Sequence, residues 1–403
     1  MVFQKNLVDF LANQQPRIEQ WFNTVWQGCI PPFTSSVDLR NAGFKIAAID
    51  ANFFPAGFNN LPSLASSFSQ QMKTTLKERY PAAQRLLIIP ENHTRNLAYY
   101  HSLTHLATLL EIAGFEVKIA SLLLKEEKMK IDLSDDESFY LYALQKKAST
   151  LFIEGFIPDL ILLNHDLSDG LPEILKNVTQ PIEPSPSLGW WKRRKSQHFC
   201  HYQTICQQFA QHFNLDVWQL APFFYSCEGI DFLEKKGFDC LVETSSQLLE
   251  KIQQKYLAYQ LPDAPFLILK ADAGTYGMSV LSISHVQEIV DLNRKQRNKL
   301  SRRKGKQKVE SVILQEGIPT IEKSATNQAV AEPVLYMTGT KVMGGFYRVH
   351  PHRSAHDNLN TPGMGFEPMN FLPDTNSLHY AYSVIARLSL LAMAQEAKEG
   401  ALI

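Results

Sequence analysis

The apolar residues of the first part of the chain follow two different periodicities. In residues 3–25 they recur at helical spacing, and residues 64–79 repeat that pattern. Between these stretches, residues 36–54 contain two strand-like runs on either side of Asn41-Ala42-Gly43, a sequence typical of a hairpin turn. The first part of the chain therefore predicts two helical stretches with a β-hairpin between them.

From residue 84 onward the pattern changes to an alternation of strands and helices. It predicts strands at 85–90, 115–122 and 158–164, a helix at 96–113 that ends at Gly114, and an acidic helix at 135–147. Such an alternation is typical of a small parallel α/β unit, in which ligands gather at the carboxyl ends of the strands. Polar residues occupy those ends: His93, Asn96, Asn164 and Asp166.

The rest of the chain is richer in strands. A proline-rich stretch at 179–191 reads as a connector, and helices are expected at 195–213, 244–260 and 376–398. The strands expected here are 265–270, 279–283, 309–315, 334–338 and 341–350. We therefore predict an α/β (α+β) protein of three parts, with boundaries at 1–80, 81–185 and 186–403.

Composition narrows the classes of partner. The 403 residues contain 40 Lys plus Arg and 40 Asp plus Glu, so no global charge attracts nucleic acid or an anionic membrane. A basic run at 294–308 lacks interleaved aromatic residues and fits a mobile lid or a solvated helix. No apolar stretch is long enough for a membrane helix, the start does not fit a signal peptide, and the five cysteines contain no C-x-x-C pair. These features predict a cytoplasmic protein with reduced thiols and small-molecule partners; they leave the oligomeric state open.

The strongest local signal for chemistry surrounds Lys270. A buried strand delivers this lysine, and a short loop containing glycine then turns back into a second strand. Backbone N–H groups in such a loop can wrap phosphate oxygens, while the ammonium group supplies the balancing charge. The alternative is an ordinary hairpin with a surface lysine. The candidate nucleotide-binding residues here are Lys270, Asp272, Gly274, Thr275, Tyr276 and Gly277.

Further along, an apolar strand runs into Gln315-Glu316-Gly317, and a strand ending in Arg348 precedes a loop with Asn358 and Asn360. This order of segments resembles the ATP-grasp proteins. The resemblance implies that residues 315–317 lie along adenine, and that Arg348 and the asparagine loop lie near the γ-phosphate.

ATP-grasp proteins commonly end on a strand that holds magnesium with an acidic-x-Asn pair, yet this chain ends in a helix. Near the N-terminus, however, Asp50-Ala51-Asn52 has that character, and Asp38 lies on the preceding strand. This arrangement resembles the circularly permuted eukaryotic glutathione synthetases, and it implies that residues 37–52 pair beside strand 341–350. Hard oxygen ligands suit magnesium, which makes Asp38, Asp50 and Asn52 the metal candidates. Asp50 and Asn52 could instead only shape a turn, and Glu332 or Asp272 could be the third ligand.

Over residues 38–368 whole segments resemble an uncommon bacterial family of glutamate–cysteine ligases of the ATP-grasp type. The segments are DLRNAGFKIAAIDANFFPAGFNNL, PENHTRN, LLNHDLSDG, GWWKRRKSQHF, KADAGTYGM, ILQEGI and GGFYRVH with NLNTPGMGFEP. Where members of that family carry a second glycine after the glycine loop, this chain has Ser279. The resemblance implies that ATP and Mg²⁺ activate L-glutamate as an acyl phosphate that the amine of L-cysteine attacks, the first step of glutathione biosynthesis.

In that reading residues 81–185 form an inserted substrate domain within a circularly permuted ATP-grasp body. Lys195 and Lys270 would hold the nucleotide phosphates, and the catalytic residues would be Arg348, Lys270 and Arg40. The amino-acid substrates would meet Arg40, Asn96, Asn164 and Asp166. The alternatives are a glutathione synthetase or another amino-acid ligase on the same scaffold, and a nucleotide-binding protein without catalysis.

Overall fold

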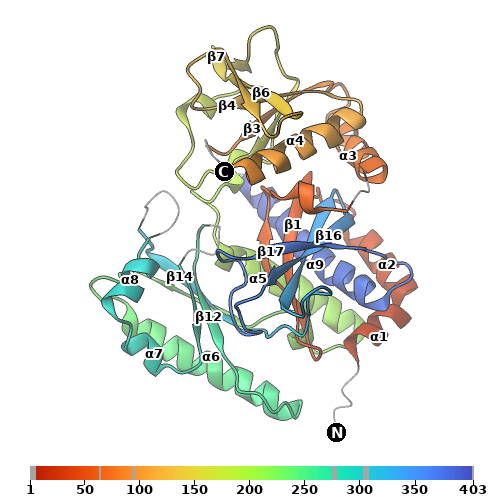
Figure 1. Ribbon diagram of the computed structural model, residues 1–403. Coiled ribbons are helices and arrows are strands. Elements are labelled where there is room, and N and C mark those ends of the chain that lie inside the picture. The colour runs from red at the N-terminus through yellow and green to blue at the C-terminus, as the bar shows by residue number, and fades with distance from the viewer. Residues whose placement is uncertain (1–5, 63–64, 93–95, 275–278, 303–307, 402–403) are drawn as a thin grey trace.

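The computed structural model describes residues 6–62, 65–92, 96–274, 279–302 and 308–401. Its strands form three larger sheets, of five, six and four strands, and one two-stranded ribbon. In Figure 1 the six-stranded sheet lies at the top, the five-stranded sheet below it, and the four-stranded sheet at the lower left. Thr275, Tyr276 and Gly277 of the predicted phosphate loop lie outside the described residues.

The five-stranded sheet joins the two ends of the chain. Its order is β17-β16-β15-β1-β2, with every neighbouring pair antiparallel. The predicted hairpin is confirmed as β1 and β2, but the expected pairing beside strand 341–350 is wrong, because β15 lies between them. The bounds are β1 Thr34–Asn41, β2 Ile46–Asn52, β15 Val330–Thr338, β16 Lys341–His350 and β17 Gly365–Met369.

Side chains along these strands alternate between the two faces of the sheet. One face packs on the main hydrophobic core, and the other carries charged residues. On β1, Val37 and Leu39 belong to the main hydrophobic core, so Asp38, between them in the sequence, points to the opposite face. The same alternation places Glu332 of β15 and Arg348 of β16 on that opposite face. Charged side chains from three strands therefore gather on one side of the sheet.

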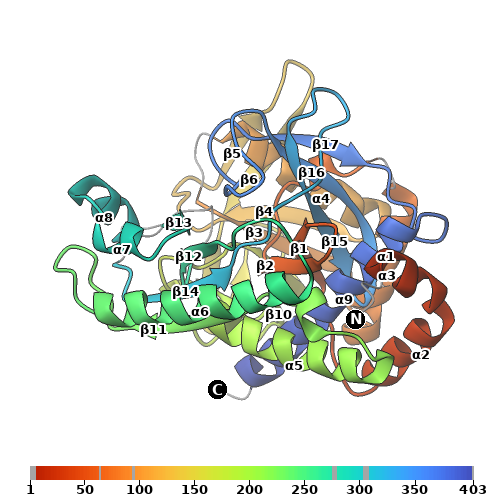
Figure 2. The same cartoon turned by 90° about the horizontal axis from the view of Figure 1, so that it is seen from below.

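Helices α5 and α9 cover the apolar face together with α1 and α2 (Figure 2). The helix predicted at 3–25 is two helices. The first ends before Gln14, and the second begins at Gln15 with Pro16 in its first turn. The predicted bounds of α5 are confirmed, and those of α9 differ by a few residues. The bounds are α1 Leu7–Asn13, α2 Gln15–Val25, α5 Lys195–Phe213 and α9 Ser377–Ala401. No helix in the described ranges is long and apolar enough to cross a membrane.

The six-stranded sheet has the order β10-β9-β3-β4-β6-β5 and is parallel except at the β5–β6 pair. The helix predicted at 135–147 is wrong. Phe139, Leu141 and Ala143 alternate inward as a strand, and the acidic residues before them form the turn after β5. The elements of this part are α3 Ala65–Arg79, β3 Arg85–Pro90, α4 Leu97–Ile112, β4 Glu116–Ser121, β5 Lys128–Asp132, β6 Ser138–Ala143, β7 Gln145–Lys147, β8 Thr150–Phe152, β9 Leu160–Asn164 and β10 Ile182–Glu183.

The four-stranded sheet has the order β11-β14-β12-β13 and is antiparallel, with α6 packed on one face. Leu267, Leu269 and Ala271 of β12 face that helix, so Ile268 and Lys270 face the opposite way. The basic run at 294–308 includes the capped helix α8, and its residues 303–307 lie outside the described part. The bounds are β11 Phe224–Glu228, α6 Phe238–Ala258, β12 Leu267–Ala271, β13 Val280–Ile283, α7 Gln287–Val290, α8 Arg294–Leu300 and β14 Ser311–Glu316.

Candidate functional site

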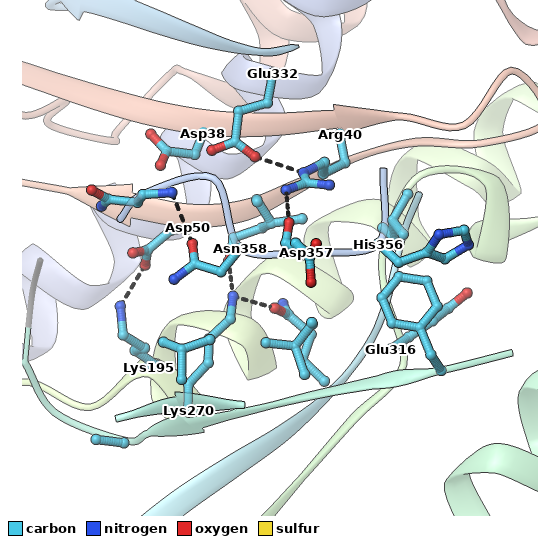
Figure 3. Close-up of a pocket in the computed structure, with 18 of the residues that line it drawn as sticks. Asp38, Arg40, Asp50, Lys195, Lys270, Glu316, Glu332, His356, Asp357 and Asn358 are labelled. Carbon is cyan, nitrogen blue, oxygen red and sulfur yellow. Dashed lines mark hydrogen bonds and ion pairs between the residues drawn. The ribbon is translucent and has the colours of Figure 1, made fainter. Parts of the chain in front are cut away.

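The five-stranded and four-stranded sheets face each other across a pocket with an empty volume of about 820 Å³. We name it the lysine pocket after Lys195 and Lys270, which lie opposite the carboxylates and arginines of the larger sheet (Figure 3). Its polar and charged lining residues are Asp38, Arg40, Asp50, Lys195, Lys270, Gln315, Glu316, Glu332, Arg348, His356, Asp357, Asn358 and Asn360.

The two lysines contact the end of β2. Lys195 Nζ donates to Asp50 Oδ1 at 2.6 Å, and Lys270 Nζ donates to the carbonyl oxygen of Ile49 at 2.9 Å and to Gln315 Oε1 at 2.7 Å. Burial raises the pKa of Asp50, but the Lys195 and Lys270 ammonium groups outweigh it and lower the pKa to about 2. Burial lowers the pKa of Lys270 to about 8, against the pull of Asp50. Residues predicted from opposite halves of the sequence therefore meet in one pocket.

Arg348 is held by two acidic side chains. Its Nη1 donates to Asp38 Oδ2 at 2.7 Å and to Glu332 Oε1. Burial raises the pKa of Asp38 and would also raise that of Glu332, but the guanidinium groups of Arg40 and Arg348 hold the pKa of Glu332 below its usual range. Arg348 Nε is buried without a hydrogen-bond partner among the described residues, as is Nε2 of Gln315. Both side chains line the lysine pocket, but these two nitrogens are enclosed by protein atoms.

Apolar side chains also line the pocket: Phe266, Ile268, Val280 and Ile318. The Phe266 ring packs against the backbone of Gly317, where a Cβ atom would lie 2.2 Å from the ring, so only glycine fits there. An apolar lining of this kind suits a nucleobase.

Three predicted binding residues have other tasks in the structure. The Glu316 carboxylate is buried and accepts from Lys45 Nζ at 2.7 Å and Trp218 Nε1 at 2.8 Å. Asp272 accepts from the backbone N–H of Ser196 at 2.7 Å, so it caps the start of α5, and it does not line the pocket. The Glu316 carboxylate therefore joins Lys45 and Trp218 at the wall of the pocket, and Asp272 lies outside the lining.

Arg40 is the third of these residues. Its Nε donates to Glu332 at 2.6 Å, and its two terminal nitrogens donate to the carbonyl oxygens of Ala355 (2.9 Å) and Asp357 (2.7 Å). Each terminal nitrogen carries a second N–H group and Arg40 lines the pocket, so its role as a substrate ligand stays a prediction. Arg40 also anchors the loop that carries Asn358 and Asn360 to the sheet.

A second pocket, of about 1340 Å³, lies between the five-stranded sheet and the carboxyl ends of β3 and β9. We name it the asparagine pocket, and it contains the predicted substrate residues Asn96, Asn164 and Asp166. The Asn96 side chain accepts from the backbone N–H of Tyr99 as the N-cap of α4, and Asn164 Nδ2 donates to the Pro55 carbonyl at 2.8 Å. The asparagine residues that line it are Asn52, Asn59, Asn60, Asn96, Asn164 and Asn360.

The two pockets meet at one place. Asp38, Asp50, Arg348 and Asn360 line both of them, and each comes from the five-stranded sheet or the loop after β16. Among the described residues these four border both pockets, so molecules bound in the two pockets would approach each other beside them.

The predicted metal ligands only partly fit magnesium. Asp38 and Asp50 are cross-strand partners on β1 and β2, so two carboxylates of the type that magnesium prefers lie side by side. Asn52 Oδ1 instead accepts from the Phe54 N–H at 2.9 Å, the turn-forming alternative for this residue. Within the described ranges no group of three or more His, Cys, Asp or Glu side chains is arranged to hold a metal ion. Two carboxylates plus phosphate oxygens are the donor set that the residues support.

A buried ionic network behind β2 carried no signal in the sequence. Arg193 donates to the Ala51 carbonyl at 2.7 Å and forms a two-point ion pair with Glu396 of α9, at 2.7 and 3.2 Å. Glu396 also contacts His198. Burial raises the pKa of Glu396, but Arg193 and His198 lower it to about 2. The network ties the strand that carries Asp50 to the C-terminal helix, and its partners are too far apart in the sequence to be matched by inspection.

Comparison with known proteins identifies the family. Residues 9–397 match the model of the glutamate–cysteine ligase family. The chain belongs to the glutamate–cysteine ligase family. A solved structure from Methylobacillus flagellatus KT, named as a candidate gamma-glutamylcysteine synthetase, is 42% identical, with a TM-score of 0.91 over 99% of this chain and 98% of that one. A search of curated proteins gives no match.

Two more distant structures are synthetases by name. The D-alanyl-alanine synthetase A of Vibrio cholerae O1 biovar eltor str. N16961 is 12% identical with a TM-score of 0.35, covering 76% of this chain and 81% of that one. The D-cycloserine synthetase DcsG is 10% identical with a TM-score of 0.39, covering 76% and 82%.

Proposed function

We propose that this glutamate–cysteine ligase uses the lysine pocket for ATP and the asparagine pocket for glutamate and cysteine. The observation that carries the proposal is the junction of the two pockets at Asp38, Asp50, Arg348 and Asn360. ATP-dependent ligation needs the γ-phosphate and the substrate carboxylate within bonding reach of each other, and a shared wall provides such a place.

The nucleotide would lie with its base against the apolar lining and its phosphates toward the lysines. Phe266 and Ile268 would contact the base, and Gln315 also lines the pocket. Lys195 and Lys270 supply positive charge for the phosphate oxygens. Because Asp50 already pairs with Lys195, bound phosphate would compete with Asp50 for this lysine.

The reaction would begin when an oxygen of the glutamate γ-carboxylate attacks the γ-phosphorus and ADP leaves. The amine nitrogen of cysteine then attacks the acyl carbon, loses a proton, and inorganic phosphate departs. Arg348 lines both pockets, so its guanidinium group would stabilise the negative charge that grows on the phosphoryl and acyl oxygens in the two steps. Asp38 and Asp50 would hold magnesium, which when bound neutralises charge on the phosphate oxygens.

Among the asparagine-pocket residues, Asn96, Asn164 and Asp166 are proposed to orient the amino acids, with Asp166 accepting from an ammonium group. Arg40 holds the loop of Asn358 and Asn360 in place. It also lines the lysine pocket, so it stays a proposed partner for a substrate carboxylate.

We also propose that the body of the protein is a circularly permuted ATP-grasp fold with residues 81–185 inserted. The five-stranded sheet supports this proposal, because the N-terminal hairpin β1–β2 supplies an acidic strand beside the C-terminal strands β15–β17. All strands of the six-stranded sheet come from residues 85–183, which fits an insertion.

The test is a substrate-dependence assay with product identification. Purified protein should release phosphate from Mg–ATP only when L-glutamate and L-cysteine are both present, and mass spectrometry should find γ-glutamylcysteine. Turnover with γ-glutamylcysteine plus glycine, and none with glutamate plus cysteine, would instead identify a glutathione synthetase. ATP binding without any ligation would favour the non-catalytic alternative.

A further inference from the structure

Two cysteines outside both pockets touch each other. Cys227 lies in β11 and Cys240 in the first turn of α6, and their Sγ atoms are 2.8 Å apart. Both are free thiols. The Thr244 hydroxyl lies 3.7 Å from the Cys227 sulfur and 3.8 Å from the Cys240 sulfur. Such a contact needs only a small further approach to reach the roughly 2.0 Å of a disulfide bond.

The connection between β11 and α6 holds the two sulfurs in place. Asp231 and Lys236 exchange two backbone hydrogen bonds of 3.0 Å, which closes the segment between the cysteines into a tight turn. Gly237 then begins α6 with φ of +76°, and a Cβ there would lie 2.7 Å from Ile230 Cδ1. The thiols are therefore brought together by a defined backbone and not by chance contact of two loops.

The two thiols differ in access. Cys240 is exposed, whereas Cys227 is 1% exposed and belongs to the core under α6. Burial raises the pKa of Cys227 to about 12, so this thiol stays protonated at neutral pH. An oxidant from solution would reach Cys240 first, and Cys227 would complete the bond.

We propose that Cys227 and Cys240 form a redox modification site that closes reversibly into a disulfide by exchange with a small-molecule disulfide. Cys240, as its thiolate, attacks one sulfur of RSSR, forms a mixed disulfide and releases RS⁻. Cys227 then gives up its proton and attacks the Cys240 sulfur, which expels a second RS⁻. The two protein protons end on the two thiols RSH, so the protein is oxidised by two electrons and RSSR is reduced.

The disulfide would fasten β11 to α6 in the half of the protein that carries Lys270. Because neither cysteine lines the lysine pocket or the asparagine pocket, we infer that closure stabilises this half without blocking either pocket. Linking residues 13 apart removes freedom from the unfolded chain, so the oxidised protein should melt several degrees above the reduced one.

The experiment uses the full chain with hydroxyethyl disulfide as the probe. After incubation, free thiols are alkylated and the protein is digested with trypsin, which cuts at Lys235 and Lys236 between the two cysteines. The proposal expects two peptides joined by a Cys227–Cys240 bond that dithiothreitol separates, together with the rise in melting temperature. Cys240→Ser should lose both results. Cys200→Ser, which removes another exposed thiol, should keep both.

Three results would overturn the proposal. The first is a lasting mixed disulfide on Cys240 while Cys227 stays alkylatable. The second is a Cys240-linked dimer on a non-reducing gel. The third is an oxidised protein that melts no higher than the reduced one. Because both peptides and the melting curve come from the wild-type chain, poor folding of a variant cannot hide any of them.

Discussion

Lys270 illustrates how a single buried charge can indicate a ligand. Its two hydrogen-bond partners, the Ile49 carbonyl and the Gln315 amide oxygen, are both neutral. The nearest negative charge acting on it is Asp50, which is already paired with Lys195. A buried ammonium group whose direct partners carry no charge is suited to an anionic ligand such as phosphate.

Replacing Lys270 with alanine should therefore weaken ATP binding by roughly 10- to 100-fold, the usual worth of a hydrogen bond to a charged group. Calorimetric titration measures the affinity, and circular dichroism checks that the fold persists. Lys236→Ala, an exposed lysine of the same half, is the control and should bind ATP as the wild type does. Unchanged ATP affinity in Lys270→Ala would mean that Lys270 is an ordinary hairpin residue and does not bind the nucleotide.

The same lysine predicts a pH dependence. Its pKa of about 8 means that half of the ammonium form is lost at about pH 8 and most of it by about pH 9. Wild-type ATP affinity should therefore fall between about pH 8 and pH 9.5, while Lys270→Arg, which stays charged, should show a flatter profile. Parallel profiles for the two proteins would assign the titration to another group.

Asp50 and Asn52 separate a metal ligand from a turn residue. Asp50→Asn should lower turnover by about a hundredfold or more, because a preorganised charge at the phosphates is lost, and high magnesium should restore part of it. Asn52→Ala should cost much less, since the Asn52 amide serves the turn at Phe54. Steady-state kinetics over a magnesium series decide between them. An equal, magnesium-sensitive loss in both variants would restore Asn52 as a ligand.

For single residues, the sequence predicts which side chains line the pocket better than it predicts the contacts that they make. Lys195, Lys270 and Arg348, which were predicted to hold or face the nucleotide phosphates, line the lysine pocket. The contacts of Arg40 and Asp272 were not predicted, because their partners, Glu332 and Ser196, lie 292 and 76 residues away in the sequence. Spacing along the chain carries no information about such contacts.

Among the elements, strands and helices with regular spacing were predicted well, and the exceptions have physical reasons. The run before residue 143 has acidic residues that suggested a helix start, yet its aromatic alternation belongs to β6. Strands β11 and β17 were not predicted, because their own residues show no clear alternation. They form strands by pairing with β14 and β16. Short strands depend on their neighbours more than on their own sequence.

The ion pair between Glu396 of α9 and Arg193, which also binds the Ala51 carbonyl of β2, yields a stability prediction. Glu396 has a folded pKa of about 2 against an ordinary value of 4.5, so its contribution is present above about pH 4.5 and is lost as the pH falls toward 2. Glu396→Gln should destabilise the protein at pH 7 by roughly 3–5 kcal/mol, since Arg193 is left buried without its carboxylate. Chemical unfolding over a pH series measures this.

The control lies one turn along the same helix. Glu399 is about half exposed and contacts His201 and Gln197, so Glu399→Gln should change stability by less than about 1 kcal/mol. The difference in the free energy of unfolding between wild type and Glu396→Gln should become smaller as the pH is lowered. A difference that stays constant down to acidic pH would mean that the ion pair with Arg193 is not its source.

For the whole molecule, sequence order and spatial order differ. The N-terminal hairpin was expected in the main sheet from the Asp50 segment, and it is there, but β15 and not β16 is its neighbour. Sheet order depends on which strands form hairpins along the chain, and β15 and β16 are joined by a turn at Gly339 that keeps them adjacent. No pattern within residues 37–52 could reveal that choice.

The junction of the two pockets predicts that ATP and glutamate bind cooperatively. Asp38 and Asp50 line both pockets, and in the proposed arrangement the glutamate γ-carboxylate would bind beside these acidic side chains. Bound Mg–nucleotide would engage these carboxylates, so glutamate should bind more tightly in its presence. The factor should lie on the order of 5 to 150, and thermodynamic linkage requires the same factor for the nucleotide when glutamate is added.

Calorimetry with a non-hydrolysable ATP analogue measures both directions of this coupling. Arg348→Lys, which alters the junction, should bring the factor toward one. Asn96→Ala, which alters only the asparagine pocket, should weaken glutamate binding and leave the factor unchanged. Because a coupling free energy belongs to the residues that both ligands contact, this contrast locates it at the junction. Independent binding of the two ligands to the wild-type protein would mean that the shared wall is not where their reacting groups meet.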